Sequence, residues 1–187
     1  MTYQLHNLNV LIVEDMPPML ELTRNILENF GFTEIHTASD GDTGFEAFQY
    51  YRPDLVITDW AMEPTDGLDL TWHIRSSPKS FNIQTPIIMM TGFSHKMRVE
   101  KARDTGITEF IAKPFTAKDL YNRIETVIER PRQFVLTNSF LGPDRRRRSD
   151  RDYQGPPRRA TDKPNIDLDD SQDDILLELR DSTQKNT

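Results

Sequence analysis

Short runs of β-branched and apolar residues alternate along the chain with longer stretches in which apolar residues recur every three or four positions. The short runs are Asn9–Val13, Thr33–His36, Leu55–Thr58, Pro86–Met90 and Glu109–Ala112. Runs of this kind are typical of buried parallel strands, and the longer stretches are typical of amphipathic helices. The pattern predicts an α/β fold: a doubly wound, five-stranded parallel sheet with helices on both faces.

The expected helices are 17–30, 42–51, 66–75, 94–104 and 116–129. Pro17 and Pro18 suit the first turn of a helix, and Gly31 suits the position just after its last turn. Pro53 ends the second helical stretch, and Pro131 follows the fifth. These stop signals agree with the apolar periodicity, so the two kinds of evidence predict the same boundaries.

Polar side chains stand where four of the apolar runs stop. Glu14 and Asp15 follow the first run, Asp59 the third, Thr91 the fourth and Lys113 the fifth. Ligands of open α/β sheets bind beyond the carboxyl ends of the strands. We therefore expect these five side chains to lie together on one edge of the sheet.

Three clustered carboxylates repel one another unless a cation shares their site. Oxygen ligands with room for water suit Mg²⁺, and the absence of cysteine and the scarcity of histidine argue against zinc. Lys113 offers a charge and Thr91 a hydroxyl donor to a phosphoryl group, with an aspartate as nucleophile. The alternative is that each acidic residue is a solvated loop charge.

Residues 8 to about 129 resemble a CheY-like response-regulator receiver domain, a flavodoxin-like fold. The motifs that carry the resemblance are Glu14-Asp15, Thr58-Asp59-Trp60, Asp66-Gly67 seven and eight residues after Asp59, Thr91-Gly92 and Lys113-Pro114-Phe115. One departure is that Met62 is followed by Glu63 and then Pro64, where the family often has Met-Pro. Trp60 itself is expected to rest on the surface of its loop.

The resemblance implies a role for each matching residue. Asp59 would accept phosphate from a histidine kinase or phosphotransfer protein, and the protein would not be an enzyme in its own right. Thr91 and Lys113 would contact the phosphoryl group, and the Lys113–Pro114 bond would be cis. Phe110 matches the switch aromatic of the family, although a plain core phenylalanine is the competing interpretation. The implied Mg²⁺ ligands are Glu14, Asp15, Asp59 and the backbone carbonyl of Ala61.

Composition divides the 187 residues into unequal parts. We expect a receiver domain at 8–130, a connector at 131–142, an arginine-rich segment at 143–163 and an acidic, mostly disordered tail at 164–187, because aliphatic residues become sparse beyond Leu141. The 57 residues after Arg130 are too poor in apolar residues for a DNA-binding domain, so nucleic acid is an unlikely partner. No leader-like segment and no 18-residue apolar run stand out, so the expected location is cytoplasmic.

The segment 143–163 carries eight basic and four acidic residues, and from 131 to 163 arginine outnumbers lysine eight to one. Arginine reads the guanine edge and clamps phosphate with two parallel bonds, aspartate accepts from guanine N–H groups, and tyrosine stacks on bases. The segment resembles the arginine-rich extension of the Cle subfamily, which implies cyclic di-GMP as ligand and the flagellar motor as a candidate partner. The candidate ligand-binding residues are Arg145, Arg146, Arg147, Arg148, Asp150, Arg151, Tyr153, Arg158, Arg159 and Asp162.

Two functional hypotheses follow from the sequence. In the first, phosphorylation controls a binding module whose tail also senses cyclic di-GMP. In the second, the chain is a phosphorelay intermediate whose basic tail docks a protein, a nucleic acid or a membrane surface. Guanine selectivity of the tail separates the two.

Overall fold

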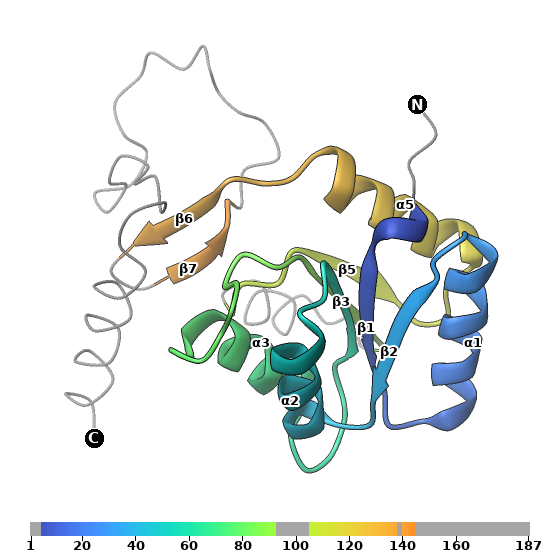
Figure 1. The fold of residues 1–187 in the computed structure, drawn as a ribbon, viewed down its shortest axis with the longest axis horizontal. Coiled ribbons are helices and arrows are strands. Elements are labelled where there is room, and N and C mark those ends of the chain that lie inside the picture. The colour runs from blue at the N-terminus through green and yellow to red at the C-terminus, as the bar shows by residue number, and fades with distance from the viewer. Residues whose placement is uncertain (1–4, 93–104, 138–139, 145–187) are drawn as a thin grey trace.

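A five-stranded parallel sheet forms the centre of the molecule (Figure 1). The computed structural model describes residues 5–92, 105–137 and 140–144. Its strands are β1 (Asn9–Val13), β2 (Glu34–Ala38), β3 (Leu55–Asp59), β4 (Ile87–Thr91) and β5 (Glu109–Ala112), in the order β2-β1-β3-β4-β5. The predicted fold class is therefore confirmed for this part of the chain.

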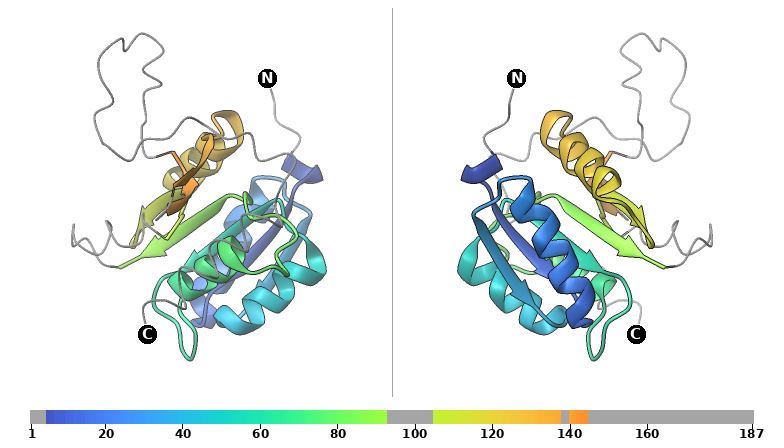
Figure 2. Two further views of the ribbon diagram at one scale, coloured as in Figure 1. Left: turned by 90° about the vertical axis from the view of Figure 1, so that its left-hand side faces the viewer. Right: turned by 90° about the vertical axis from the view of Figure 1, so that its right-hand side faces the viewer.

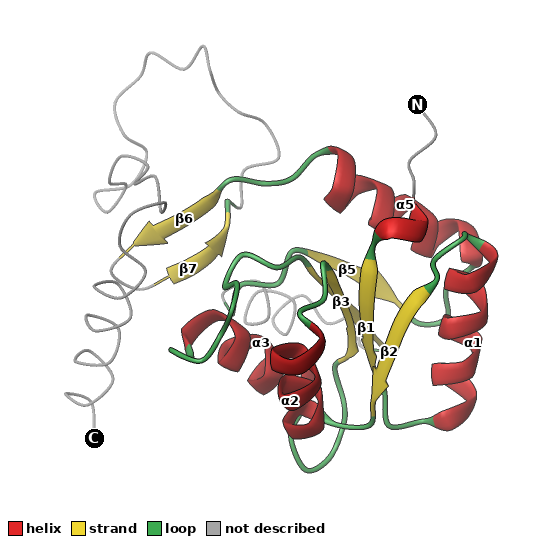
Figure 3. Ribbon diagram, in the orientation of Figure 1, coloured by secondary structure: helices red, strands yellow, loops and turns green. Residues whose placement is uncertain are grey.

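Four α-helices and one short 3-10 helix accompany the sheet within the described residues. They are η1 (Leu5–Asn7), α1 (Pro17–Asn29), α2 (Gly41–Tyr51), α3 (Gly67–Ser76) and α5 (Ala117–Glu129) (Figure 3). The helix expected at 94–104 lies outside the described residues. None of the described helices is both long and apolar enough to cross a membrane.

The helices begin and end where local chemistry requires it. Asp40 caps α2 by accepting from the N–H groups of Asp42 and Thr43, and Asp66 caps α3 in the same way. Thr116 and Asp119 form a reciprocal capping box at the start of α5. Gly31 follows α1 with a φ of 93°, a conformation that glycine adopts without strain, so its predicted place after the helix end is confirmed.

Alternating residues of each central strand face two separate cores. In β1, Val10 and Ile12 pack toward α1 and α5, whereas Leu11 and Val13 pack toward α2 and α3. Figure 2 shows the sheet enclosed between these two helical layers. Because both faces are covered, the central strands β1, β3 and β4 are largely apolar, as is usual for parallel sheets.

An antiparallel hairpin follows α5, in the part of the chain where the sequence indicated a connector. Its strands are β6 (Phe134–Thr137) and β7 (Phe140–Pro143), with Phe134 paired to Pro143 and Thr137 paired to Phe140. Beyond Asp144, the arginine-rich segment and the acidic tail lie outside the described residues, as do all ten candidate nucleotide-binding residues. The expectations for those residues therefore stay predictions.

Candidate functional site: an acidic pocket at the carboxyl edge of the sheet

The carboxyl ends of the strands bring three acidic residues together, as the strand pattern predicted. Glu14 and Asp15 directly follow β1, and Asp59 is the last residue of β3. Oxygen atoms of the three carboxylates lie within 4.8 Å of one another. Glu14 is 1% exposed and Asp59 is 7% exposed, whereas Asp15 is exposed. Two of the three negative charges are therefore largely removed from solvent.

Lys113 supplies the cation of this cluster. It follows β5, and its Nζ lies 2.8 Å from Glu14 Oε2 and 2.9 Å from Asp59 Oδ1. One ammonium group thus bridges carboxylates from two different strand ends. The Lys113–Pro114 peptide bond is cis, as the family resemblance implied.

The pKa values of these groups reflect the sharing of one cation by several anions. Burial raises the pKa of the Glu14 carboxyl, the charge on Asp59 raises it further, and the hydrogen bond from Lys113 opposes the change. Burial alone would lower the pKa of Lys113, but its hydrogen bonds to Glu14 and Asp59 outweigh burial, so that pKa is raised. The ammonium is stabilised by two anions, while Glu14 must balance one cation against a neighbouring anion.

The residues present fit a hard divalent cation. Three carboxylates face one another, a single ammonium only partly offsets their charge, and the proximity of Asp59 makes ionised Glu14 less favourable. Carboxylate oxygens are the ligands that Mg²⁺ prefers, and exposed Asp15 leaves room for the water that Mg²⁺ retains. Ala61 is also exposed and lies two residues beyond Asp59 in the β3–α3 loop.

Thr91 lies at the same edge, as predicted. It ends β4 and is 4% exposed, and Met90 before it pairs with Asp59 across the two strands. Its carbonyl oxygen accepts from the N–H of Lys113 at 2.7 Å. The backbone therefore fixes Thr91 and Lys113 beside each other and beside Asp59.

The loop after Asp59 is held by contacts that the residue pattern did not reveal. Trp60 N–H donates to the carbonyl of Met90, and Gly67 N–H donates to the carbonyl of Trp60, each at 3.0 Å. A Cβ at Gly67 would lie 2.0 Å from the Asp59 carbonyl oxygen. The Asp66-Gly67 pair was visible in the sequence as a motif, but its function here, a helix cap followed by a close backbone approach, depends on the folded loop.

Trp60 corrects one expectation. It is 8% exposed and packs with Leu68, Met89 and Ile107, with Phe110 against the same group. The surface position predicted for this side chain was wrong, because Trp60 continues the hydrogen bonding of β3 to β4 by one residue and so turns its ring inward. Phe110 is half-buried beside it, which leaves open both the switch and the plain core interpretation.

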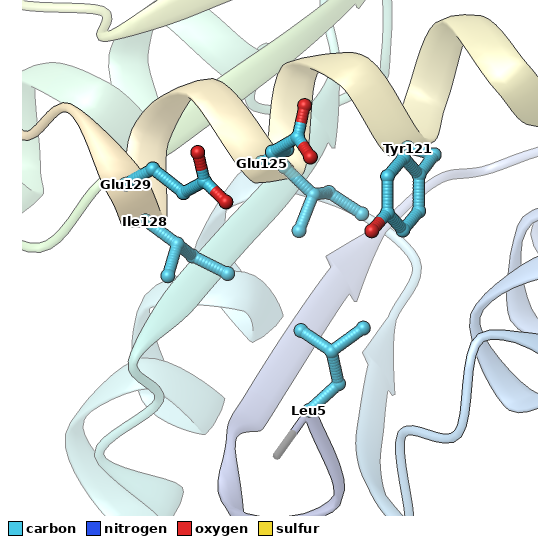
Figure 4. A pocket seen from close by; sticks show the side chains of 6 residues that line it. Leu5, Tyr121, Glu125, Ile128 and Glu129 are labelled. Carbon is cyan, nitrogen blue, oxygen red and sulfur yellow. The ribbon is translucent and has the colours of Figure 1, made fainter. Parts of the chain in front are cut away.

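A second hollow lies between η1 and α5 (Figure 4). It gathers no residue of the acidic cluster, and we assign it no part in phosphoryl chemistry. Its lining residues are Leu5, Tyr121, Ile124, Glu125, Ile128 and Glu129.

Comparisons with known proteins agree with this geometry. The family described as "Response regulator receiver domain" matches residues 10–125. Chemotaxis protein CheY-3 of Vibrio cholerae is 32% identical over 124 residues, covering 66% of this chain and 94% of that protein. Chemotaxis protein CheY of Pseudomonas aeruginosa is 31% identical over 123 residues, covering 66% and 98% respectively.

A solved structure resembles the described part of the chain as well. Chemotaxis protein CheY4 of Vibrio cholerae superposes with a TM-score of 0.58 at 26% identity, covering 64% of this chain and 98% of that one. The chain therefore belongs to the response-regulator receiver family, with a receiver domain of the CheY type.

Proposed function

We propose that Asp59 accepts a phosphoryl group from a phosphohistidine of a histidine kinase or phosphotransfer protein. The observation that carries this proposal is the contact of Lys113 Nζ with both Asp59 Oδ1 and Glu14 Oε2 at the carboxyl edge of the sheet. It places a fixed positive charge beside a nearly buried carboxylate, where negative charge would increase on phosphorylation.

The transfer exchanges one bond to phosphorus for another. An oxygen of Asp59 forms the new P–O bond as the P–N bond of phosphohistidine breaks, and the imidazole nitrogen keeps the electron pair. Lys113 holds one phosphoryl oxygen by charge, and the Thr91 hydroxyl donates to another. Phe110, which packs against the Trp60 group, is the switch aromatic: its rotamer changes when Thr91 moves to contact the phosphoryl group.

Mg²⁺ completes the site. Glu14, Asp15, Asp59 and the carbonyl of Ala61 are the proposed ligands, which the acidic cluster supports. When bound, the ion supplies positive charge that offsets the carboxylates and the phosphoryl oxygens.

Intact mass spectrometry tests this assignment. We expect one phosphoryl mass gain when the chain is incubated with acetyl phosphate and Mg²⁺, and none after Asp59→Asn or with chelator. Asp69→Asn is the matched control, because it removes an exposed carboxylate of α3 outside the cluster. Equal labelling of Asp59→Asn and the unchanged chain would refute the role of Asp59.

For the tail, we propose that the arginine-rich segment binds cyclic di-GMP and thereby controls a protein partner, with the flagellar motor as candidate. The support is the choice of arginine over lysine, the repeated Gly-Pro-x-Arg-Arg at 142–146 and 155–159, and the Arg-x-x-Asp spacing at 147–150 and 159–162. Planar arginine forks and nearby aspartates suit guanine and phosphate together.

The competing proposal for the tail is a phosphorelay intermediate that docks a protein or another polyanion. A polyanion site needs charge alone, so it should bind unrelated anions alike and weaken steeply with salt. Isothermal titration of the full chain with cyclic di-GMP, pGpG, GTP and a short RNA separates the two. Equal affinity for all four would favour the polyanion.

A further inference from the structure

The β6–β7 hairpin joins the receiver domain to the arginine-rich segment. Asp144 N–H donates to the carbonyl of Gln133 at 2.7 Å, so backbone pairing continues to the last described residue, the second of that segment. A two-stranded hairpin alone is at best marginally stable in water. Contacts with the receiver domain therefore decide whether it stays folded.

The first such contact is an ion pair at the start of β5. Glu109, the first residue of that strand, is 4% exposed and binds the guanidinium of Arg132, two residues before β6. Arg123 of α5 lies 3.5 Å from its other oxygen. A buried carboxylate is costly without partners, so releasing Arg132 would remove one of the charges that stabilise Glu109.

The second contact is made by a buried arginine of α3. Arg75 is 2% exposed; its Nε donates to the carbonyl of Gly106 at 3.0 Å and its Nη1 to the carbonyl of Ile83 at 2.6 Å. Among the described residues no carboxylate pairs with it, and its Nη2 has no hydrogen-bond partner. The ring of Phe134, the first residue of β6, lies 5.0 Å from its guanidinium carbon.

The ring of Phe134 partly takes the place of the carboxylate partner that the buried guanidinium of Arg75 lacks among the described residues. Burial lowers the pKa of this guanidinium to about 9, which indicates how poorly the charge is solvated. The face of an aromatic ring attracts a cation, and more strongly away from water. Phe134 therefore supports the charge of Arg75, and Arg75 holds the hairpin against α3.

These contacts lie at the amino ends of the strands, whereas the acidic pocket lies at the carboxyl ends. Figure 1 shows the hairpin beyond the end of β5 from which that strand starts. The strand itself connects the two regions: Glu109 begins it and binds Arg132, and Lys113 directly follows it and binds Asp59. Phe110, next to Glu109, packs against the Trp60 group beside the acidic pocket.

We propose that the β6–β7 hairpin is a latch on the receiver domain, held by Arg132–Glu109 and Phe134–Arg75, and that phosphorylation of Asp59 opens it through β5. The proposal rests on the proposed function of Asp59. The unmodified chain has the hairpin docked, and release is the direction of coupling that we propose. Opening frees the start of the arginine-rich segment from the receiver domain.

Hydrogen exchange of the full chain, read by mass spectrometry over residues 131–137 and 140–144, tests the latch. We expect slow exchange in the unmodified chain. When acetyl phosphate and Mg²⁺ are added, the exchange rate should increase roughly fivefold or more, because fivefold is the lower end of the coupling usually found between two sites. Arg132→Gln and Phe134→Leu should exchange fast in both conditions. Arg130→Gln, which removes an exposed charge nearby, should behave as the unchanged chain.

Phosphoryl mass is measured on the same samples, so two kinds of failure are distinguished. A mass gain on Asp59 with unchanged exchange would overturn the latch alone. Absence of any mass gain would overturn the proposed function and the latch with it. Circular dichroism checks that each variant is folded; if Arg132→Gln is not, Phe134→Leu decides, because it removes no charged group and leaves both arginine partners of Glu109 in place. Slow exchange in Phe134→Leu would also contradict the proposal.

Discussion

Gly67 lies directly against Asp59, so closely that a β-carbon at position 67 would be 2.0 Å from the Asp59 carbonyl oxygen and 3.0 Å from Thr58 Oγ1. The Asp59 carbonyl oxygen also accepts a hydrogen bond from the Thr58 hydroxyl at 2.9 Å. The first turn of α3 is therefore fixed against the backbone of the proposed acceptor. A side chain at position 67 would have to displace Asp59 or the helix.

Gly67→Ala should destabilise the fold by about 1–3 kcal/mol, the usual cost of overpacking, and should slow phosphorylation of Asp59. Urea unfolding measures the first effect, and the rate of mass gain with acetyl phosphate measures the second. Gly92→Ala is the matched control, because its added carbon meets no described atom within 4 Å. Equal stability of the two variants would contradict the close approach.

Lys113→Gln should leave Glu14 and Asp59 without their shared cation. We expect a loss of about 3–5 kcal/mol of unfolding free energy in the absence of metal, since two carboxylates largely removed from solvent would then face each other unpaired. Added Mg²⁺ should restore part of the loss by binding only the folded state. Unfolding with and without Mg²⁺ measures both effects, with exposed Lys118→Gln as control. A Lys113→Gln chain as stable as this control would refute the role of the ion pair.

Asp40 should make the stability of α2 depend on pH. Hydrogen bonds from the backbone N–H of Thr43 above all, and from the Thr43 and Ser39 hydroxyls and the Asp42 N–H, lower the pKa of Asp40 from the ordinary value of 3.8. Because the folded state holds the proton less tightly, the contribution is complete above pH 3.8 and is lost as the pH falls through the lower folded pKa.

Asp40→Ala should therefore cost about 1 kcal/mol at pH 7, the usual value of a helix cap, and less near pH 2. Asp40→Asn keeps an oxygen acceptor but cannot lose or gain a proton, so it serves as the control for the pH dependence of stability. Urea unfolding at the two pH values gives the comparison. The cap assignment fails if Asp40→Ala is as stable as the unchanged chain at pH 7.

Arg147→Lys in the tail should weaken cyclic di-GMP binding by roughly tenfold, because charge is kept while one charge-assisted bond of about 1.4 kcal/mol is lost. Arg180→Lys, outside the arginine-rich segment, should have no effect. Isothermal titration of the full chain measures both, and micromolar affinity is expected, since ordering a segment on binding consumes about 2–5 kcal/mol. Unchanged binding by Arg147→Lys would favour the polyanion proposal.

The acidic pocket was predictable from sequence because each of its residues is tied to a strand end, and the strand ends follow from short apolar runs. Lys113 is 54 residues from Asp59 in the chain, yet the parallel order of the sheet alone brings both to one edge. Boundaries shifted by one or two residues, as for β2, without moving any residue of the pocket to another edge.

The features that were not predicted depend on contacts between distant residues. Nothing local distinguishes Arg75 from the exposed arginines of the chain; its burial follows from the packing of α3 against the loops that precede β4 and β5. The hairpin strands are four residues each and are stabilised by residues from elsewhere in the chain. Trp60 follows a strand end, and its burial depends on packing with Leu68, Met89 and Ile107, which come from three other parts of the chain.

The position of the hairpin affects which sides of the receiver domain a phosphate donor and a partner would occupy. Under the proposed function, a phosphate donor must reach Asp59 at the carboxyl edge of the sheet, whereas Asp144, the last described residue, ends the hairpin at the amino edge. A partner bound beside Asp144 would therefore lie away from the path of a phosphate donor. Under the proposed function, Asp59 would then be phosphorylated again while such a partner stays bound, without a cycle of release and recapture.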